Sequence, residues 1–282
     1  MRKESMPEMS RPETVAEVVG TFHRRLNRFR EHNDYRAIFL HAYLIITRRF
    51  LAALEKSSSG GERVFLDAEW TEELLVAFAN LYLDTLQEEE ASYYHSSTWA
   101  IAHRCAKSQK GTVVEDLLLG VNAHINVDLA FAVYLVLNNE RVGTSDPVLL
   151  ARRKFDYEQV NRILFECIDP IEEEISRYYG GVIGVLDVVM GSLDEALTRY
   201  GVRRFREQVW WHGLSLLCAE TPEERALVRE RIEAEAQQVA ENITSIRSWP
   251  FSWLHRIQRS LRRSTMGALS ENPDGEPAVR SA

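Results

Sequence analysis

The sequence lacks the local signatures of the common enzyme classes. It has no G-x-S-x-G nucleophile elbow, no Walker phosphate loop, no G-x-G-x-x-G dinucleotide motif and no H-E-x-x-H zinc motif. An excess of basic residues is missing as well, because 34 Lys and Arg stand against 42 Asp and Glu and give a net charge of −8. A general nucleic-acid binder presents a basic face, so we expect no nucleic-acid partner.

Cysteine is scarce too. Cys105, Cys167 and Cys218 are far apart, and no CxxC pair occurs, so neither a structural zinc site nor a disulfide framework is indicated. A low, odd count is typical of a reducing compartment, and we expect all three to be buried as small apolar residues. The start of the chain has no apolar signal-peptide core, and the longest apolar run, Leu129–Leu137, is too short to span a bilayer. We therefore expect a cytoplasmic protein.

Helical periodicity is what the sequence does contain. Apolar residues recur at helical spacing, and capping boxes such as Thr112–Glu115 and Thr221–Glu224 indicate helix starts. No segment alternates like a strand. We therefore expect an all-α, single-domain multi-helix bundle around a buried central helix at about residues 112–139. The expected division of the chain is a disordered leader (1–10), the helical domain (11–246), a basic amphipathic C-terminal helix (247–263) and a disordered tail (264–282).

The centre of the expected bundle is Leu117–Leu137, LLLGVNAHINVDLAFAVYLVL, which is apolar apart from four strongly polar residues. A helix that is apolar on all sides is buried on all sides, so each polar side chain needs a partner in the core. Helical spacing places Asn122 and Asn126 on one face and His124 and Asp128 on a nearly opposite one. We expect the two Asn residues to lock neighbouring helices in place, since an amide can hold a backbone carbonyl and a backbone amide at once.

The motif LLLGVNAHINVDL at Leu117–Leu129, together with several weaker patterns, resembles a mainly bacterial family, domain of unknown function 5995. The weaker patterns are FxxxYxxxT at Phe39, Tyr43 and Thr47, FANLYLD at 78–84, FDYEQVNRIL at 155–164, VLD at 185–187 and RxxxW at Arg206 and Trp210. The resemblance implies a shared helical fold over roughly residues 15–240. It implies no activity, cofactor or substrate, and it has no counterpart for the chain after about residue 243.

His124 and Asp128 are the pair on which we expect chemistry to depend. Their i, i+4 spacing lets both reach a common metal, or lets Asp128 orient an imidazole that carries protons near neutral pH. If Asp84 and Asp156 converge on them, the oxygen-rich set would suit magnesium or manganese better than zinc. In this first hypothesis the protein is an enzyme, with a metal-assisted hydrolase as the expected kind, and Arg206 is an anion clamp.

The same polar residues also fit a second hypothesis, in which the protein is a non-catalytic ligand-binding or scaffold protein. Buried polar side chains often satisfy helix ends, loop backbones and one another, and a buried arginine is more often architectural than catalytic. An unidentified small molecule would be the ligand in either case. The residues that we expect in such a structural polar core are Asn122, Asn126, Asn80, Asn161 and Tyr43.

A third hypothesis concerns the chain from Arg247 to Arg263, which contains five arginines and no acidic residue between apolar side chains. This composition is typical of a helix in a membrane interface with its arginines toward anionic lipid. It also fits a final helix docked on the acidic body of the protein, which is the alternative we favour. The sequence does not indicate an oligomeric state.

Overall fold

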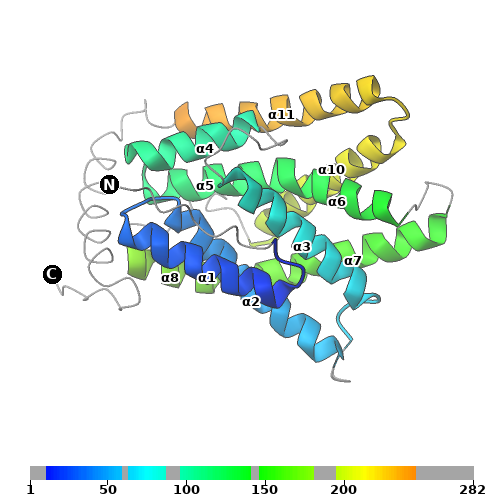
Figure 1. The fold of residues 1–282 in the computed structure, drawn as a ribbon, viewed down its shortest axis with the longest axis horizontal. Coiled ribbons are helices and arrows are strands. Elements are labelled where there is room, and N and C mark those ends of the chain that lie inside the picture. The colour runs from blue at the N-terminus through cyan, green and yellow to red at the C-terminus, as the bar shows by residue number, and fades with distance from the viewer. Residues whose placement is uncertain (1–10, 59–62, 87–95, 141–145, 181–194, 246–282) are drawn as a thin grey trace.

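The structure is a computed structural model that describes residues 11–58, 63–86, 96–140, 146–180 and 195–245. Throughout these ranges the regular elements are helices and no strand occurs, so the expected all-α bundle is confirmed (Figure 1). The expectations for the leader 1–10, the VLD pattern at 185–187, the basic segment 247–263 and the tail 264–282 concern residues outside the described ranges.

The chain order of the helices is as follows. The helices are α1 (Val15–Glu31), α2 (Ala37–Ser58), α3 (Ala68–Thr85), α4 (Ser97–Ser108), α5 (Val113–Ala123), the π-helix η1 (His124–Asp128), α6 (Leu129–Asn139), α7 (Pro147–Glu166), α8 (Ile168–Tyr179), α10 (Glu195–Cys218) and α11 (Pro222–Ser245).

The two capping boxes expected from the sequence are present. Thr112 Oγ1 accepts from Glu115 N at 3.2 Å while Glu115 Oε2 accepts from Thr112 N at 2.9 Å, which starts α5. Thr221 and Glu224 make the same exchange at the start of α11, at 3.1 and 3.2 Å. Each box satisfies amide groups that the first helical turn leaves unpaired, and an N-cap of this kind stabilises a protein by about 1 kcal/mol.

Helices α5, η1 and α6 run on without a break from Val113 to Asn139 and form a central rod. Helices α2, α3, α4, α10 and α11 all pack against this rod, with α4 and α11 above it and α1 and α2 below it in Figure 1. The rod lies at the expected place, but it contains a π-helical turn where the sequence predicted regular α-helix. Residues of the rod with no exposed surface include Leu119, Ala123, Val127, Val133 and Leu137, all part of one hydrophobic core.

Two glycines permit helices to approach the rod closely. A Cβ atom on Gly120 in α5 would lie 2.5 Å from the ring of Phe39 in α2. On Gly213 in α10 it would lie 2.6 Å from Val133 Cγ1 in α6. Both distances are shorter than carbon atoms tolerate, so the absence of a side chain allows α2 and α10 to pack where they do.

Two helical segments, 37–57 and 113–139, are long and apolar enough by length and composition to cross a membrane. The second is the central rod, which passes because its polar residues in the middle are few and mostly uncharged. In both segments most of the apolar window, 61% and 67%, is buried inside the fold. Core helices of globular proteins have the same composition, and this degree of burial matches that role.

The cysteines do not all have the environment that we expected. Cys105 and Cys167 are buried as predicted, but Cys218 is exposed, so the prediction for Cys218 is wrong. The reason is its position as the last residue of α10, where it faces away from the core.

Candidate functional site

His124 and Asp128 form a hydrogen-bonded pair in the middle of the central rod. They are the first and last residues of the π-helix η1, and His124 Nδ1 lies 2.8 Å from Asp128 Oδ2. Only 3% of the His124 surface and none of the Asp128 surface is exposed. The i, i+4 spacing therefore brings the two side chains together deep inside the protein.

Trp99 in α4 fixes the protonation pattern of this pair. Its Nε1, which can only donate, lies 3.0 and 2.9 Å from the two carboxylate oxygens of Asp128. A carboxylate that already accepts from Trp99 also accepts from His124, so we assign the imidazole proton to Nδ1. Nε2 of His124 is then the nitrogen with a free lone pair.

Aromatic rings from three helices surround the imidazole. Phe78 stacks on it almost in parallel, with ring centroids 3.5 Å apart and planes 6° apart. Tyr43 packs at 4.3 Å with its ring tilted by 60°. We call the complete set the aromatic cage; it consists of Phe39 and Tyr43 from α2, Phe78 and Tyr82 from α3, and Trp99 from α4.

Burial sets the electrostatics of the aromatic cage. It lowers the pKa of His124 well below the usual 6.5, because a charged imidazole would lose its hydration there. Burial, and after it the negative charge of Asp128, raises the pKa of the Tyr43 hydroxyl. At neutral pH the imidazole is therefore uncharged and the phenol keeps its proton.

The Nε2 atom of His124 is buried, and no described residue offers it a hydrogen bond. A buried polar atom without a partner is unusual in a folded protein and calls for an explanation. It also sits in a π-helical turn, and such turns within α-helices are frequent at functional sites. An imidazole whose Nδ1–H is held by a carboxylate presents Nε2 as a hydrogen-bond acceptor or general base.

The other carboxylates expected as metal ligands lie elsewhere. Asp84 forms an ion pair with Arg11 at 3.1 Å, and Asp156 accepts from Leu66 N at 2.7 Å and Asp67 N at 2.8 Å. Among the described residues, no group of three or more His, Cys, Asp or Glu could hold a metal ion. The expected set of His124, Asp128, Asp84 and Asp156 is therefore not brought together: Asp84 faces the N-terminal chain and Asp156 faces a loop.

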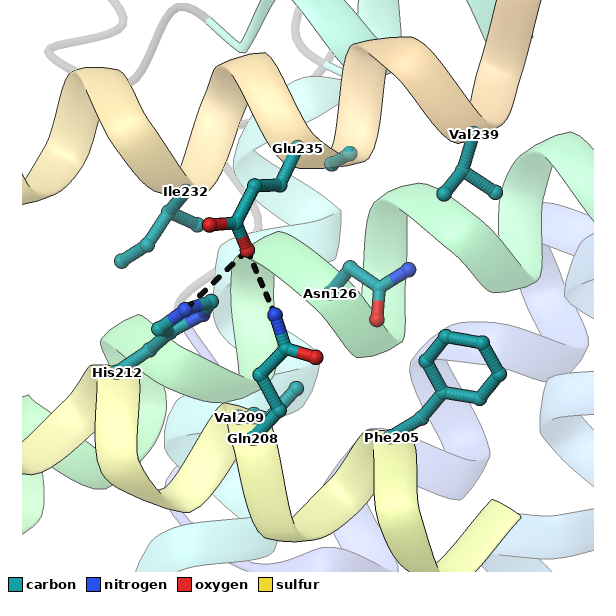
Figure 2. Close-up of a pocket in the computed structure, with 9 residues that line it drawn as sticks. Asn126, Phe205, Gln208, Val209, His212, Ile232, Glu235 and Val239 are labelled. Atoms are coloured by element: carbon teal, nitrogen blue, oxygen red, sulfur yellow. Dashed lines mark hydrogen bonds and ion pairs between the residues drawn. The ribbon is translucent and has the colours of Figure 1, made fainter. Parts of the chain in front are cut away.

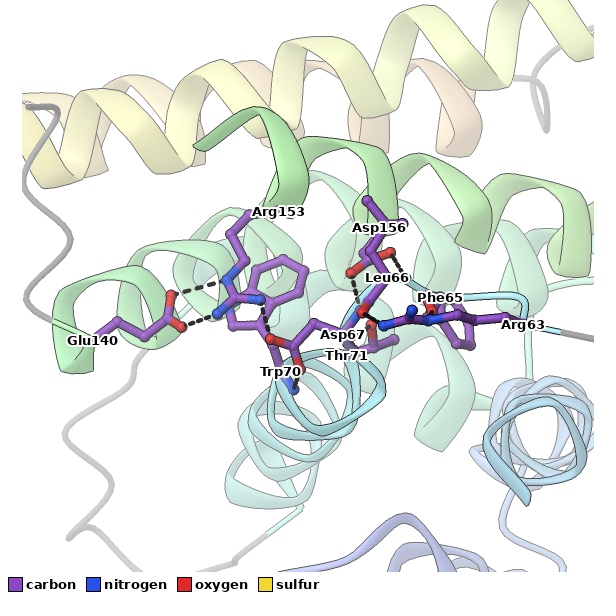
Figure 3. A network of polar contacts seen from close by, with 9 residues as sticks. All are labelled: Arg63, Phe65, Leu66, Asp67, Trp70, Thr71, Glu140, Arg153 and Asp156. Carbon is purple, nitrogen blue, oxygen red and sulfur yellow. Dashed lines mark hydrogen bonds and ion pairs between the residues drawn. The ribbon is translucent and has the colours of Figure 1, made fainter. Parts of the chain in front are cut away.

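Asp156 belongs to a polar network at the start of α3 (Figure 3). Its two amide partners lie in the loop before α3, and Asp67 in turn caps α3 by accepting from Trp70 N at 3.1 Å. Arg153 joins Asp67, at 2.6 Å, to Glu140 at the end of α6, at 2.5 Å. The network ties three elements together, which is an architectural role.

Arg206, expected as an anion clamp, is buried against Tyr157. Its Nη2 donates to Tyr157 O at 3.0 Å, its Cζ lies 4.3 Å from the centre of the Tyr157 ring, and Tyr157 Oη donates to Arg206 O at 2.8 Å. Burial lowers the pKa of this guanidinium. These contacts join α10 to α7, and none of the described contacts of Arg206 is with His124 or Asp128.

The asparagines make contacts with the backbone and with each other. Asn122 Nδ2 donates to Ala236 O in α11 at 2.9 Å, and Asn126 Nδ2 donates to Asn122 Oδ1 at 2.7 Å. Asn80 Nδ2 donates to Pro12 O at 3.0 Å. Asn161 is buried in α7, and its Oδ1 has no hydrogen-bond partner in the described part of the chain. Tyr43, which we placed in the same structural set, is buried and forms part of the aromatic cage.

Sequence reasoning did not identify Trp99 as part of the site. It is 29 residues before Asp128 and on another helix, so no local spacing links the two. No pattern in the surrounding segment indicated that Trp99 contacts Asp128. Phe78 and Tyr82 belong to the FANLYLD pattern of an apolar helix, and nothing in that pattern indicated a contact with His124.

Comparison of the chain with known proteins places it in a family. No curated protein and no solved structure matches the chain. A family model does match, from residue 15 at the start of α1 to residue 246, just after the end of α11. It therefore covers all the helices described above. The chain belongs to this family, whose description is "Family of unknown function (DUF5995)".

Proposed function

We propose that the protein binds a small molecule against Nε2 of His124 and that this nitrogen acts as a hydrogen-bond acceptor and general base. One observation carries the proposal. The proton of the imidazole is committed to Asp128 through Nδ1, while Nε2 is buried without a partner among the described residues. A polar atom in that condition lowers stability, by about 1–3 kcal/mol, unless a ligand satisfies it.

The surroundings of Nε2 define the chemistry of the ligand. The aromatic cage offers rings and, apart from Tyr43 and Tyr82, no hydroxyl group. A matching molecule has a small apolar body and one O–H or N–H group that donates to Nε2. Because His124 is only 3% exposed, such a molecule reaches it by local opening of the cage, as ligands do in other enclosed sites.

Asp128 and Trp99 are positioning residues in this proposal. Asp128 holds the Nδ1–H tautomer, and Trp99 holds the carboxylate in place with two short contacts. In hydrolytic triads a carboxylate likewise holds the histidine in the tautomer that acts as a base. The metal-assisted form of the hypothesis has less support, because the carboxylates that it required bind Arg11 and a loop backbone instead.

A structural polar core is the second candidate function for these residues. It is favoured by Asn122, Asp156 and Arg206, whose side chains donate to or accept from backbone groups of other elements. In that case His124 would only join α5 and α6 to the helices of the aromatic cage, and the protein would be a scaffold. The two candidates differ in whether Nε2 of His124 receives a ligand.

Phenol and toluene distinguish the two candidates, since they have nearly the same shape and differ in one hydroxyl donor. We expect phenol to raise the melting temperature of the wild-type protein more than toluene does, in a thermal-shift titration. The difference should vanish in His124→Phe, which keeps an aromatic ring and removes Nε2. It should persist in His103→Phe, a matched control, since the Nε2 atom of that histidine already lies 3.0 Å from Thr85 Oγ1.

Two results would overturn the proposal. Equal shifts by phenol and toluene in the wild type would mean that no donor is recognised, and together with a destabilised His124→Phe they would support the structural candidate. A preference for phenol that survives in His124→Phe would place the recognition elsewhere. The comparison in the wild type stands on its own if His124→Phe fails to fold.

A further inference from the structure

A second histidine–carboxylate pair lies at an open groove between α10 and α11 (Figure 2). The groove has a volume of about 50 Å³, which suits a small group of a ligand rather than a whole drug-sized molecule. No residue of the aromatic cage lines this groove, so the two sites are separate. Asn126 is the only lining residue that belongs to the π-helix η1. Its lining consists of Asn126, Phe205, Gln208, Val209, His212, Ile232, Glu235, Ala236 and Val239.

Apolar side chains form most of this lining. Val209, Ile232 and Ala236 are buried at its base, and Val239 and Phe205 lie toward one end (Figure 2). Phe205 is 54% exposed, which is high for a phenylalanine. An aromatic ring left open beside an apolar groove is suited to cover the body of a ligand.

Glu235 organises the polar side of the groove. Its Oε2 accepts from Gln208 Nε2 at 2.7 Å and lies 3.4 Å from His212 Nε2, while Arg231 Nε donates to Oε1 at 3.0 Å. The side chain of Arg231 is 75% exposed, so solvent screens its charge. The carboxylate therefore keeps much of its negative field on the groove side.

His212 and Asn126 add two further acceptors. His212 Nε2 lies 3.4 Å from Glu235 Oε2, so we assign the proton of the neutral ring to Nε2 and the lone pair to Nδ1. This Nδ1 atom is buried without a hydrogen-bond partner among the described residues. Asn126 uses its Nδ2 to donate to Asn122, which leaves its Oδ1 as an acceptor. Figure 2 shows Asn126 and His212 on either side of Gln208, facing the same groove.

We propose that this groove binds a small organic cation: a primary ammonium group on an apolar body. The ammonium group would donate to His212 Nδ1 and Asn126 Oδ1 and lie in the field of Glu235. An ammonium has three N–H donors and no acceptor, which matches a site of acceptors and a carboxylate. The apolar body would lie on Val209 and Ile232 under the ring of Phe205, which also attracts cations. The proposal does not depend on the function proposed for His124.

Benzylammonium is the probe that tests the proposal, with benzyl alcohol as the neutral comparison and benzoate as the anionic one. We expect benzylammonium to bind at least tenfold more tightly than either, and to shift the backbone NMR resonances of Asn126, Gln208 and Glu235. Glu235→Gln and His212→Phe should each weaken its binding about tenfold or more. Glu241→Gln is the matched control, because Glu241 lies on the same helix, outside the groove, and contacts Gln237.

Protonation of His212 provides a second readout. Desolvation lowers the pKa of His212, and of the charged groups that face it Glu235 raises this pKa and Arg231 lowers it. Below this pKa Nδ1 becomes a donor and the ring becomes positive, so the affinity for benzylammonium should fall as the pH is lowered from 7.5 through the pKa of His212. His212→Phe should remove most of this dependence.

Any of the following results would overturn the proposal. Benzyl alcohol binding as tightly as benzylammonium would mean that the charge is not recognised. Unchanged affinity in Glu235→Gln, or resonance shifts outside the groove, would mean that the cation binds elsewhere. A wild-type protein with no shifts at millimolar benzylammonium would mean that the groove is not a cation site.

Discussion

Two of the histidine–carboxylate pairs in the described structure lie in opposite environments. His124 and Asp128 are sealed in the core at 2.8 Å, whereas His212 and Glu235 face an open groove at 3.4 Å. In each pair a carboxylate orients an imidazole and leaves one ring nitrogen without a partner in the described structure. The difference shows that burial, rather than the identity of the pair, decides what each can do.

Burial of the first pair sets its charge state. Burial alone lowers the pKa of His124 well below 6.5, while that of His212 is lowered less, since Glu235 opposes the desolvation. The sealed imidazole is a neutral base, whereas the imidazole of His212 lies beside a partly solvated carboxylate at the groove.

Removing the carboxylate of Asp128 should have the largest effect on the free energy of unfolding, whereas removing that of Glu235 should have little effect. Asp128→Ala leaves Trp99 Nε1 and His124 Nδ1 as buried donors without this acceptor, so we expect a loss of about 3–5 kcal/mol in the free energy of unfolding. Glu235→Ala should change it by less than about 1 kcal/mol, because that carboxylate is partly solvated. Urea unfolding measures both. Similar losses in the two variants would contradict the contrast.

Crowding the wall of the aromatic cage should have the next largest effect. In Gly120→Ala the new methyl group meets the ring of Phe39 at 2.5 Å, and we expect a loss of about 1–3 kcal/mol in the free energy of unfolding. Gly20→Ala in α1 is the control, since its methyl group meets only the end of Arg24 at 3.4 Å. There we expect a gain of about 0.5–1 kcal/mol from helix propensity. A neutral Gly120→Ala would show that the cage is loosely packed.

The pH dependence of stability should differ between wild type and His124→Phe. Because the folded-state pKa of His124 lies below its unfolded value of about 6.5, acid protonates the unfolded chain first. Its contribution is complete above pH 6.5 and is lost as the pH falls below that value, at about 1.4 kcal/mol per pH unit. His41 and His103, whose pKa values burial lowers to about 3, act in the same direction. They cancel in the difference between the two proteins.

The measurement for this prediction is urea unfolding at pH 7.5, 6.5, 6.0 and 5.5 in both proteins. The wild-type curve should fall more steeply below pH 6.5 than the curve of His124→Phe. Parallel curves would mean that the folded protein does not lower the pKa of His124, which would contradict the effect of burial.

His212→Phe should have the smallest effect on stability. The side chain is only partly buried and its contact with Glu235 is long, so we expect a change within about 0.5 kcal/mol. The same substitution at position 124 should cost clearly more, since it removes a buried hydrogen bond. Thermal unfolding of the two variants side by side tests this. A larger loss at position 212 would reverse the roles that we assign to the two pairs.

Features that are local in the sequence could be predicted, because their partners lie within a turn of helix. The capping boxes at Thr112 and Thr221 need residues three apart, and the contact of His124 with Asp128 needs residues four apart. The buried central helix followed in the same way from its long apolar pattern around four polar residues. These features determine the fold class and the pairing of His124 with Asp128.

Features that depend on packing could not be predicted. Asp84 and Asp156 have the residue type of metal ligands, but their partners are 73 and 90 residues away in sequence. Trp99 contacts Asp128 from another helix, and Glu235 contacts His212 from another helix. No local spacing in the sequence encodes how these helices are arranged. The π-helical turn also escaped prediction, since its residues read equally well as α-helix.

The most direct test of the central claim is an NMR titration of the protein with phenol, with ¹⁵N in the histidine rings. The claim predicts that Nδ1 of His124 carries the proton and Nε2 does not. It also predicts that phenol shifts the Nε2 resonance with little change at Nδ1, whereas toluene shifts neither. An Nε2 that already carries the proton, or that does not respond to phenol at saturating concentration, would contradict the claim.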